Sequence, residues 1–129
     1  MKRSMLLALF IILVISACSV SKTKNHKVIN VDAAEFKEVL DKGDVFLLDT
    51  HIPEQQHIRG TDAFIPYNEI EQNADRLPED KSVAIAVYCR SGSMSKIASE
   101  KLVERGYETV YNLVGGANAW RSRGYEFEV

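Results

Sequence analysis

A cysteine stands where an apolar segment of the chain meets a run of small and polar residues. The segment at 83–88 reads Val-Ala-Ile-Ala-Val-Tyr, which is typical of a buried parallel strand, and Cys89 follows it directly. Ligands bind beyond the carboxyl ends of strands in open α/β sheets, and successive backbone N–H groups of a loop there stabilise an anion. The pattern therefore predicts that the loop holds Cys89 as a thiolate, which is a nucleophile.

The residues after Cys89 supply the other groups that a thiolate site needs. Arg90 is a cation that can face the anionic end of a substrate, and Gly92 permits a positive φ angle. The alternative for Cys89 is a small buried cysteine at the end of a core strand, and the alternative for Arg90 is a solvated surface arginine. A core cysteine has no need of such neighbours, so we favour the reactive thiol. Further hydrogen-bond donors are expected from the backbone N–H groups of residues 90–94, Met94 included, and from the hydroxyls of Ser91, Ser93 and Ser95.

Strand and helix patterns alternate along the rest of the chain, which indicates a single α/β domain with a parallel sheet. The helix that starts at Ser93 has its positive end behind Cys89, and Trp120 is expected in the core. The expected strands are 28–31, 45–48, 63–65, 83–88 and 110–113. The expected helices are 32–40, one or two turns near 67–74, then 93–106 and 116–123.

The loop at Cys89 resembles the active-site loop of the rhodanese family of sulfurtransferases, whose pattern is close to C-R-S-G-x-R-S before a helix. Three more segments match family patterns in the same order: 46–51 resembles the "hhDVR" strand end, 57–61 resembles "HIPGA", and 106–120 resembles "G-(F/Y)-x-x-V-x-x-L-x-G-G-x-x-x-W". The resemblance covers nearly all of the chain after residue 27 and implies a rhodanese-like domain over 28–129. It also implies that the parallel sheet has about five strands flanked by helices.

The resemblance implies a mechanism as well as a fold. In a rhodanese-like reaction, the Cys89 thiolate attacks the outer sulfur of a donor such as thiosulfate and holds that sulfur as a persulfide. The persulfide then passes the sulfur to a nucleophile such as cyanide or a thiol. The implied partners are a small sulfur-containing substrate and a thiol acceptor, and the reaction needs no cofactor and no metal.

Two positions depart from the family pattern. Met94 stands where the second arginine of the loop is usual, and His51 stands where the "hhDVR" segment has its arginine. Both changes lower the positive charge around the site, and the segment from Asp49 to His57 is shorter than in typical members. We therefore expect thiosulfate, a dianion, to bind less well than in those members. His51 is a candidate proton shuttle or titrating cation, with a surface or structural histidine as the alternative, whereas Asp49 and His57 are expected to support the fold.

The residues of the same loop also bear on two other classes of function. Phosphatases and arsenate reductases of the Cys-x5-Arg type need a guanidinium six residues after the cysteine, and that position is Ser95, which excludes them. A non-catalytic rhodanese-like module that binds a partner, or carries persulfide sulfur between envelope proteins, is the alternative to an enzyme. Met94 and His51 favour that module, whereas Cys89 followed by Arg90 favours a sulfurtransferase.

The first 17 residues predict a signal peptide. Lys2 and Arg3 precede an apolar run at 5–15, which is shorter than the roughly 20 apolar residues of a typical membrane-spanning helix. Residues 15–18, Ile-Ser-Ala-Cys, resemble a bacterial lipobox, which implies cleavage before Cys18 and lipidation of its thiol; the alternative is an ordinary secretory signal with an incidental cysteine. We expect a protein anchored in the bacterial cell envelope and facing the periplasm. Ser19 favours the outer over the inner membrane in a cell that has both.

Cleavage and lipidation would change both the charge and the thiol content of the chain. The 16 basic and 18 acidic side chains would become 14 and 18 once Lys2 and Arg3 are removed, a formal charge of −4, which argues against nucleic acid as a partner. Residues 18–27 are expected to form a solvated tether. Lipidation of Cys18 would leave Cys89 as the only thiol, with no intrachain disulfide and no two-cysteine zinc or redox site. We expect a monomer.

Overall fold

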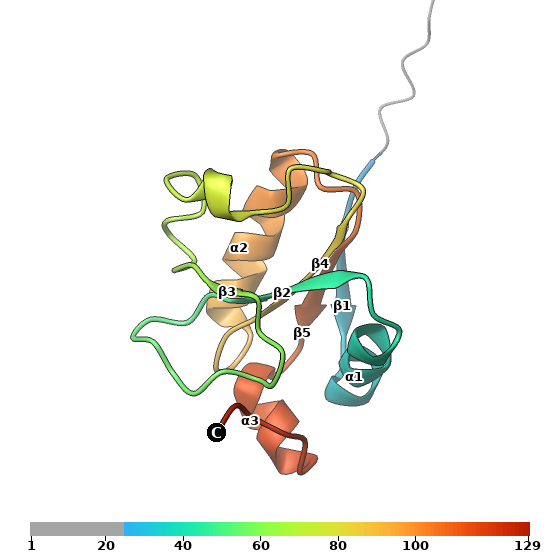
Figure 1. Ribbon diagram of the computed structural model, residues 1–129, viewed down its shortest axis with the longest axis vertical. Helices are drawn as coiled ribbons and strands as arrows, with labels where there is room; N and C mark the ends of the chain where they lie inside the picture. The colour runs from blue at the N-terminus through green and yellow to red at the C-terminus, as the bar shows by residue number, and fades with distance from the viewer. Residues whose placement is uncertain (1–24) are drawn as a thin grey trace, which may run out of the picture.

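Five parallel strands form one central sheet in the computed structural model, which describes residues 25–129 (Figure 1). The strands are β1 (Val28–Val31), β2 (Val45–Asp49), β3 (Ala63–Phe64), β4 (Ala84–Tyr88) and β5 (Val110–Leu113), and their order across the sheet is β1-β5-β4-β2-β3. Every strand pairing is parallel. The α/β fold class with a five-stranded parallel sheet is therefore confirmed.

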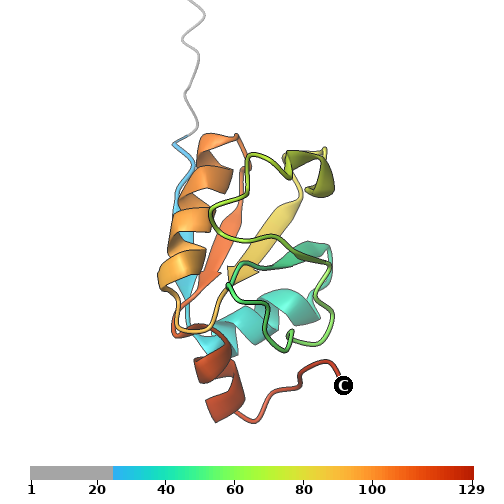
Figure 2. The same ribbon diagram turned by 90° about the vertical axis from the view of Figure 1, so that its left-hand side faces the viewer.

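Helices cover both faces of the sheet (Figures 1 and 2). The helices α1 (Ala33–Asp41) and α3 (Gly116–Ser122) pack on one face, and α2 (Ser93–Glu104) packs on the other. Strand β4 serves both cores because successive side chains of a strand point to opposite faces. Ala86 and Tyr88 lie in the core under α1 and α3, and Ile85 and Val87 lie in the core under α2.

Trp120 is a core residue, as the sequence predicts. It is 4% exposed, and its ring and that of Phe36 from α1 form a T-shaped pair with a centroid distance of 6.1 Å. The indole Nε1–H donates to the carbonyl oxygen of Glu126 at 3.0 Å, so the polar end of the ring is also satisfied. This contact ties the C-terminal segment to α3.

The local signals for the start of α1 are also confirmed. The Asp32 carboxylate accepts the backbone N–H of Glu35 at 2.9 Å, and the Glu35 carboxylate accepts the backbone N–H of Asp32 at 3.1 Å. This reciprocal capping box satisfies two N–H groups that the first turn of a helix leaves free.

The segment near 67–74 differs from the sequence expectation. It forms a series of turns followed by a single turn of 3-10 helix, η1 (Ala74–Arg76), so its helical turn comes at the end of the expected range and beyond it. The Glu69 carbonyl accepts both the side-chain amide of Asn73 at 2.9 Å and its backbone N–H at 3.2 Å, whereas the backbone N–H of Tyr67 donates to the distant carbonyl of Thr50. Strand β4 also begins at Ala84, one residue later than expected.

No helix within residues 25–129 is long and apolar enough to cross a membrane. The predicted signal peptide and Cys18 lie outside the described residues, as does the tether up to residue 24.

Candidate active site

Cys89 lies directly after β4, beyond the carboxyl end of an interior strand of the sheet. The residue is buried, and the backbone N–H of Gly92 donates to its Sγ atom at 3.0 Å. Gly92 has a φ angle of 105°, a left-handed conformation that side chains other than glycine rarely adopt. The loop thus folds back on itself so that one of its own N–H groups reaches the sulfur.

The helix α2 begins immediately after this loop. Gly92 is its N-cap residue, and no side chain caps the first turn. The free N–H groups at the start of a helix carry a partial positive charge. The start of α2 therefore adds to the positive potential near Cys89 without using a charged side chain.

The predicted site residues of the loop divide into exposed and buried groups. Arg90, Ser91 and Ser93 are exposed, whereas Met94 is half-buried. The side chain of Arg90 is therefore open to solvent beside the buried Cys89. A contact between Arg90 and the anionic end of a substrate stays a prediction.

Ser95 has a different role from the expected one. Its hydroxyl is fully buried and donates to the side-chain oxygen of Asn112 on β5 at 2.7 Å, with the carbonyl oxygen of Gly92 3.2 Å away. The side-chain amide of Asn112 in turn donates to Asn30 on β1 at 3.0 Å. A hydroxyl has one proton, so Ser95 secures the loop to the sheet instead of offering a donor to a substrate.

His51 lies at the end of β2, next to the end of β4. The preceding residue, Thr50, donates both its N–H and its hydroxyl to the carbonyl oxygen of Tyr88, at 2.9 and 3.0 Å. The His51 side chain is buried, and its Nδ1 lies 2.7 Å from the carbonyl oxygen of Pro53. A carbonyl only accepts, so His51 Nδ1 is the donor in this contact. This placement makes His51 a buried histidine that holds the loop after β2.

Asp49 and His57 form the main polar contact of that loop. The His57 ring lies 2.8 Å from Asp49 through Nδ1 and 2.7 Å from Glu54 through Nε2. Asp49 is fully buried, and it also accepts the backbone N–H of His51 at 3.0 Å and the amide of Gln55 at 3.3 Å. Burial lowers the pKa of His57, but its hydrogen bonds to Glu54 and Asp49 outweigh that effect and raise the pKa above the ordinary value.

This raised pKa predicts a pH dependence of stability. A group with a raised pKa in the folded state stabilises the fold fully below its unfolded pKa, about 6.5, and loses that contribution as the pH rises through the folded value. We expect the destabilisation caused by His57→Gln, measured by urea unfolding, to be larger at pH 5.5 than at pH 9. An equal loss of stability at both pH values would show that the imidazolium form of His57 does not hold this loop.

Tyr88 connects the same loop to the strand that carries Cys89. Its phenol oxygen accepts the backbone N–H of Ile58 at 2.9 Å and lies 2.8 Å from the hydroxyl of Thr61. Burial raises the pKa of Tyr88, so the phenol stays neutral at every ordinary pH. The 58–61 segment is thus fixed to β4 one residue before the thiol.

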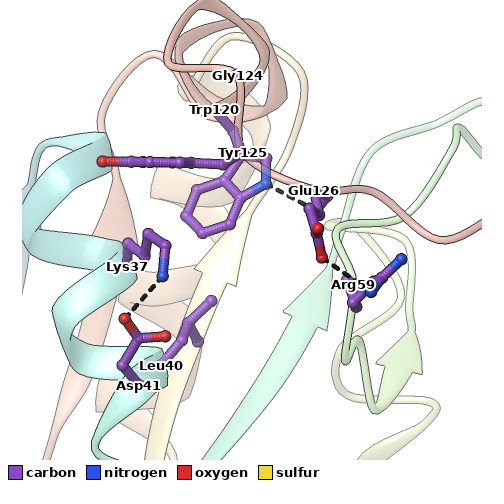
Figure 3. Close-up of a pocket in the computed structure, with 8 residues that line it drawn as sticks. All are labelled: Lys37, Leu40, Asp41, Arg59, Trp120, Gly124, Tyr125 and Glu126. Atoms are coloured by element: carbon purple, nitrogen blue, oxygen red, sulfur yellow. Dashed lines mark hydrogen bonds and ion pairs between the residues drawn. The ribbon is translucent and has the colours of Figure 1, made fainter.

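A hollow of about 550 Å³ lies elsewhere, between α1, the C-terminal segment and the loop at Arg59 (Figure 3). Its cations are already paired, Lys37 with Asp41 at 2.7 Å and Arg59 with Glu126 at 2.8 Å. None of the predicted site residues lines it. Within residues 25–129, no group of three or more His, Cys, Asp or Glu side chains is placed to hold a metal ion. We therefore centre the candidate site on the Cys89 loop.

The family model described as "Rhodanese-like domain" matches residues 21–123. The chain belongs to this family. The rhodanese-like chain is 32% identical over 100 residues to a thiosulfate sulfurtransferase GlpE of Pseudoalteromonas translucida, covering 72% of this chain and 89% of the relative. It is 34% identical over 90 residues to a sulfurtransferase of Allochromatium vinosum, covering 68% and 82% of the two chains.

Solved structures agree with this assignment of the rhodanese-like chain. The rhodanese-like domain of the Alr3790 protein from Anabaena superposes with a TM-score of 0.67 at 27% identity, covering 77% of each chain. A rhodanese-related protein from Thermoplasma volcanium superposes with a TM-score of 0.66 at 26% identity, covering 78% of this chain and 97% of that one.

Proposed function

We propose that this rhodanese-like domain is a sulfurtransferase that carries sulfane sulfur on Cys89. The single observation that supports the proposal best is the 3.0 Å hydrogen bond from the Gly92 N–H to the Cys89 Sγ, inside a loop that opens a helix. A donor aimed at sulfur favours the thiolate over the thiol and also favours a persulfide anion. The names of the relatives, sulfurtransferase and thiosulfate sulfurtransferase, agree with this chemistry.

The proposed reaction has two displacements at sulfur. The Cys89 thiolate attacks the outer sulfur of thiosulfate, a bond forms between Sγ and that sulfur, and the old S–S bond breaks with its electron pair leaving on sulfite. An acceptor thiolate then attacks the outer sulfur of the persulfide. The acceptor becomes a persulfide, and the Cys89 thiolate is regenerated with no net change in its oxidation state.

The charge around the loop sets the choice of donor. Arg90 is the one cation among the loop residues 89–95, because Met94 occupies the place of the second arginine of the family pattern. A singly charged persulfide donor therefore suits this site better than thiosulfate, which carries two negative charges.

This proposal predicts that Met94→Arg improves the reaction with thiosulfate. We expect the rate of sulfur loading from thiosulfate to rise about fivefold, because a cation beside the donor contributes on the order of 1 kcal/mol in a partly exposed site. The measurement is the initial rate of sulfite release at subsaturating thiosulfate. Met94→Gln, which is polar but neutral, is the matched control and should leave the rate near that of the wild type.

A non-catalytic module that uses the loop to bind a partner is the second candidate. It is favoured by the burial of Cys89, which is 1% exposed, together with the neutral Met94. Absence of sulfur transfer from every donor tested, in both the wild type and Met94→Arg, would exclude the enzyme and leave this candidate.

We further propose that lipid on Cys18 anchors the domain in the bacterial cell envelope, on the basis of the lipobox-like residues 15–18. The expected result is that radiolabelled palmitate labels the wild-type protein, which sediments with membranes. Cys18→Ser should lose the label and leave the membrane fraction. Labelling of Cys18→Ser at the wild-type level would contradict the anchor.

A further inference from the structure

The helix α3 begins against the backbone of the active-site loop. Its N-cap residue, Gly115, provides no side chain for capping, so the first N–H groups of the helix need other acceptors. The N–H of Ala117 donates to the carbonyl oxygen of Cys89 at 2.8 Å, and the N–H of Asn118 donates to that of Arg90 at 3.0 Å. Figure 2 shows the start of α3 beside the loop that leads into α2. The active-site loop therefore caps α3.

Gly116 makes this contact sterically feasible. A Cβ atom at position 116 would lie 2.5 Å from the carbonyl oxygen of Cys89 and 2.6 Å from the carbonyl carbon of Arg90. Both are backbone atoms, so no side-chain rotation could relieve the overlap and the loop itself would have to move. The φ angle of Gly116, 54°, adds a second reason for glycine.

The hydrogen bonds from α3 also fix the direction of the loop's own N–H groups. In a planar trans peptide the C=O and the following N–H point in opposite directions. Because the carbonyls of Cys89 and Arg90 point toward α3, the N–H groups of Arg90 and Ser91 point away from it. The next N–H, that of Gly92, reaches the Cys89 sulfur.

We propose that Gly116 is a positioning residue that sets the reactivity of Cys89 from outside its loop. By admitting α3 into contact with the two carbonyls, it aligns the N–H groups of Arg90 and Ser91, and it holds in place the part of the loop that leads to the Gly92 N–H on the sulfur. The consequence for turnover rests on the proposed sulfurtransferase function. The predicted change in the stability of the Cys89 thiolate does not depend on that function, and it can be measured separately.

Two glycine-to-alanine variants test the proposal. Gly116→Ala introduces the overlap, whereas Gly124→Ala, at the other end of α3, has a φ angle of 71° but meets no atom within 4 Å. Both carry the conformational cost of alanine at positive φ, so only the contact with the loop differs. The full chain with Cys18→Ser serves as the background, since Cys89 is then the only thiol.

The main readout is the rate of iodoacetamide alkylation of Cys89 against pH. We expect Gly116→Ala to raise the midpoint by about one pH unit, because dipoles that stabilise the thiolate are misaligned, and Gly124→Ala to leave it unchanged. Equal midpoints in Gly116→Ala and Gly124→Ala would overturn the proposal. A raised midpoint in a protein that takes up no sulfur would support this inference while contradicting the proposed function.

A measurement on the Cys18→Ser background protein without a glycine substitution covers the case in which Gly116→Ala does not fold. Coupling between sites is reciprocal, so ionisation of Cys89 must change the hydrogen bonds that α3 gives to the loop. The amide resonances of Ala117 and Asn118 should shift with pH at the alkylation midpoint, and that of Gly124 should not. If the amide chemical shifts of Ala117 and Asn118 do not change at this midpoint, the proposal is overturned even without the variant.

Discussion

Cys89→Ser is expected to reduce sulfur transfer to the level measured without protein, a loss of at least about a thousandfold. The serine hydroxyl is close in size to the thiol and can accept the same N–H from Gly92, so the loop keeps its shape. A hydroxyl does not ionise at neutral pH, however, and cannot form a persulfide. The measurement is sulfite release from thiosulfate in the presence of a thiol acceptor.

Thermal unfolding of Cys89→Ser provides the control for this loss. We expect a melting temperature close to that of the wild type, because the change removes no large apolar group and leaves no N–H without an acceptor. Substantial activity in a folded Cys89→Ser variant would place the chemistry on another residue.

Asp49→Ala is expected to lower the free energy of unfolding by about 3 kcal/mol. The fully buried Asp49 carboxylate accepts from His51 and contacts the His57 ring, so its removal leaves a buried N–H without a partner and a cation held by Glu54 alone. Urea unfolding at pH 6, where His57 is protonated, measures the effect.

An exposed ion pair gives the matched comparison for Asp49→Ala. The side chains of Lys37 and Asp41 are 40% and 62% exposed, and such pairs contribute at most about 1 kcal/mol. Asp41→Ala should therefore cost far less than Asp49→Ala. Similar losses in the two variants would mean that Asp49 is not the centre of the loop after β2.

The fold could be predicted because its signals are local. The apolar run before Cys89 and the residues Asp32 and Glu35 each specify one element within a few positions, and the structure places the corresponding strand and capped helix there. The segment near 67–74 is less regular than its sequence indicates because part of its backbone bonds to distant partners. Tyr67, for example, donates to the carbonyl of Thr50.

The candidate site was predictable as a loop but not as a set of contacts. The positive φ angle of Gly92 follows from its place after a strand and before a helix, and it is found. The role of Ser95 was not predictable, because its acceptor, Asn112, lies 17 positions later in the sequence. Asn112 in turn bonds to Asn30, which lies 82 positions before Asn112. Nor does local spacing reveal that Ala117 donates to the carbonyl of Cys89. Such pairings depend on the strand order of the folded sheet.

The role of Cys89 as a sulfur carrier is tested most directly by the intact mass of the full chain after incubation with thiosulfate and, separately, with persulfide donors. We predict a gain of one sulfur, about 32 Da, that peptide mapping assigns to Cys89 and that a thiol acceptor then removes. Cys89→Ser should gain nothing under the same conditions. Failure of every donor to add sulfur to Cys89 in the folded wild-type protein would contradict the assignment of this loop as a sulfur carrier.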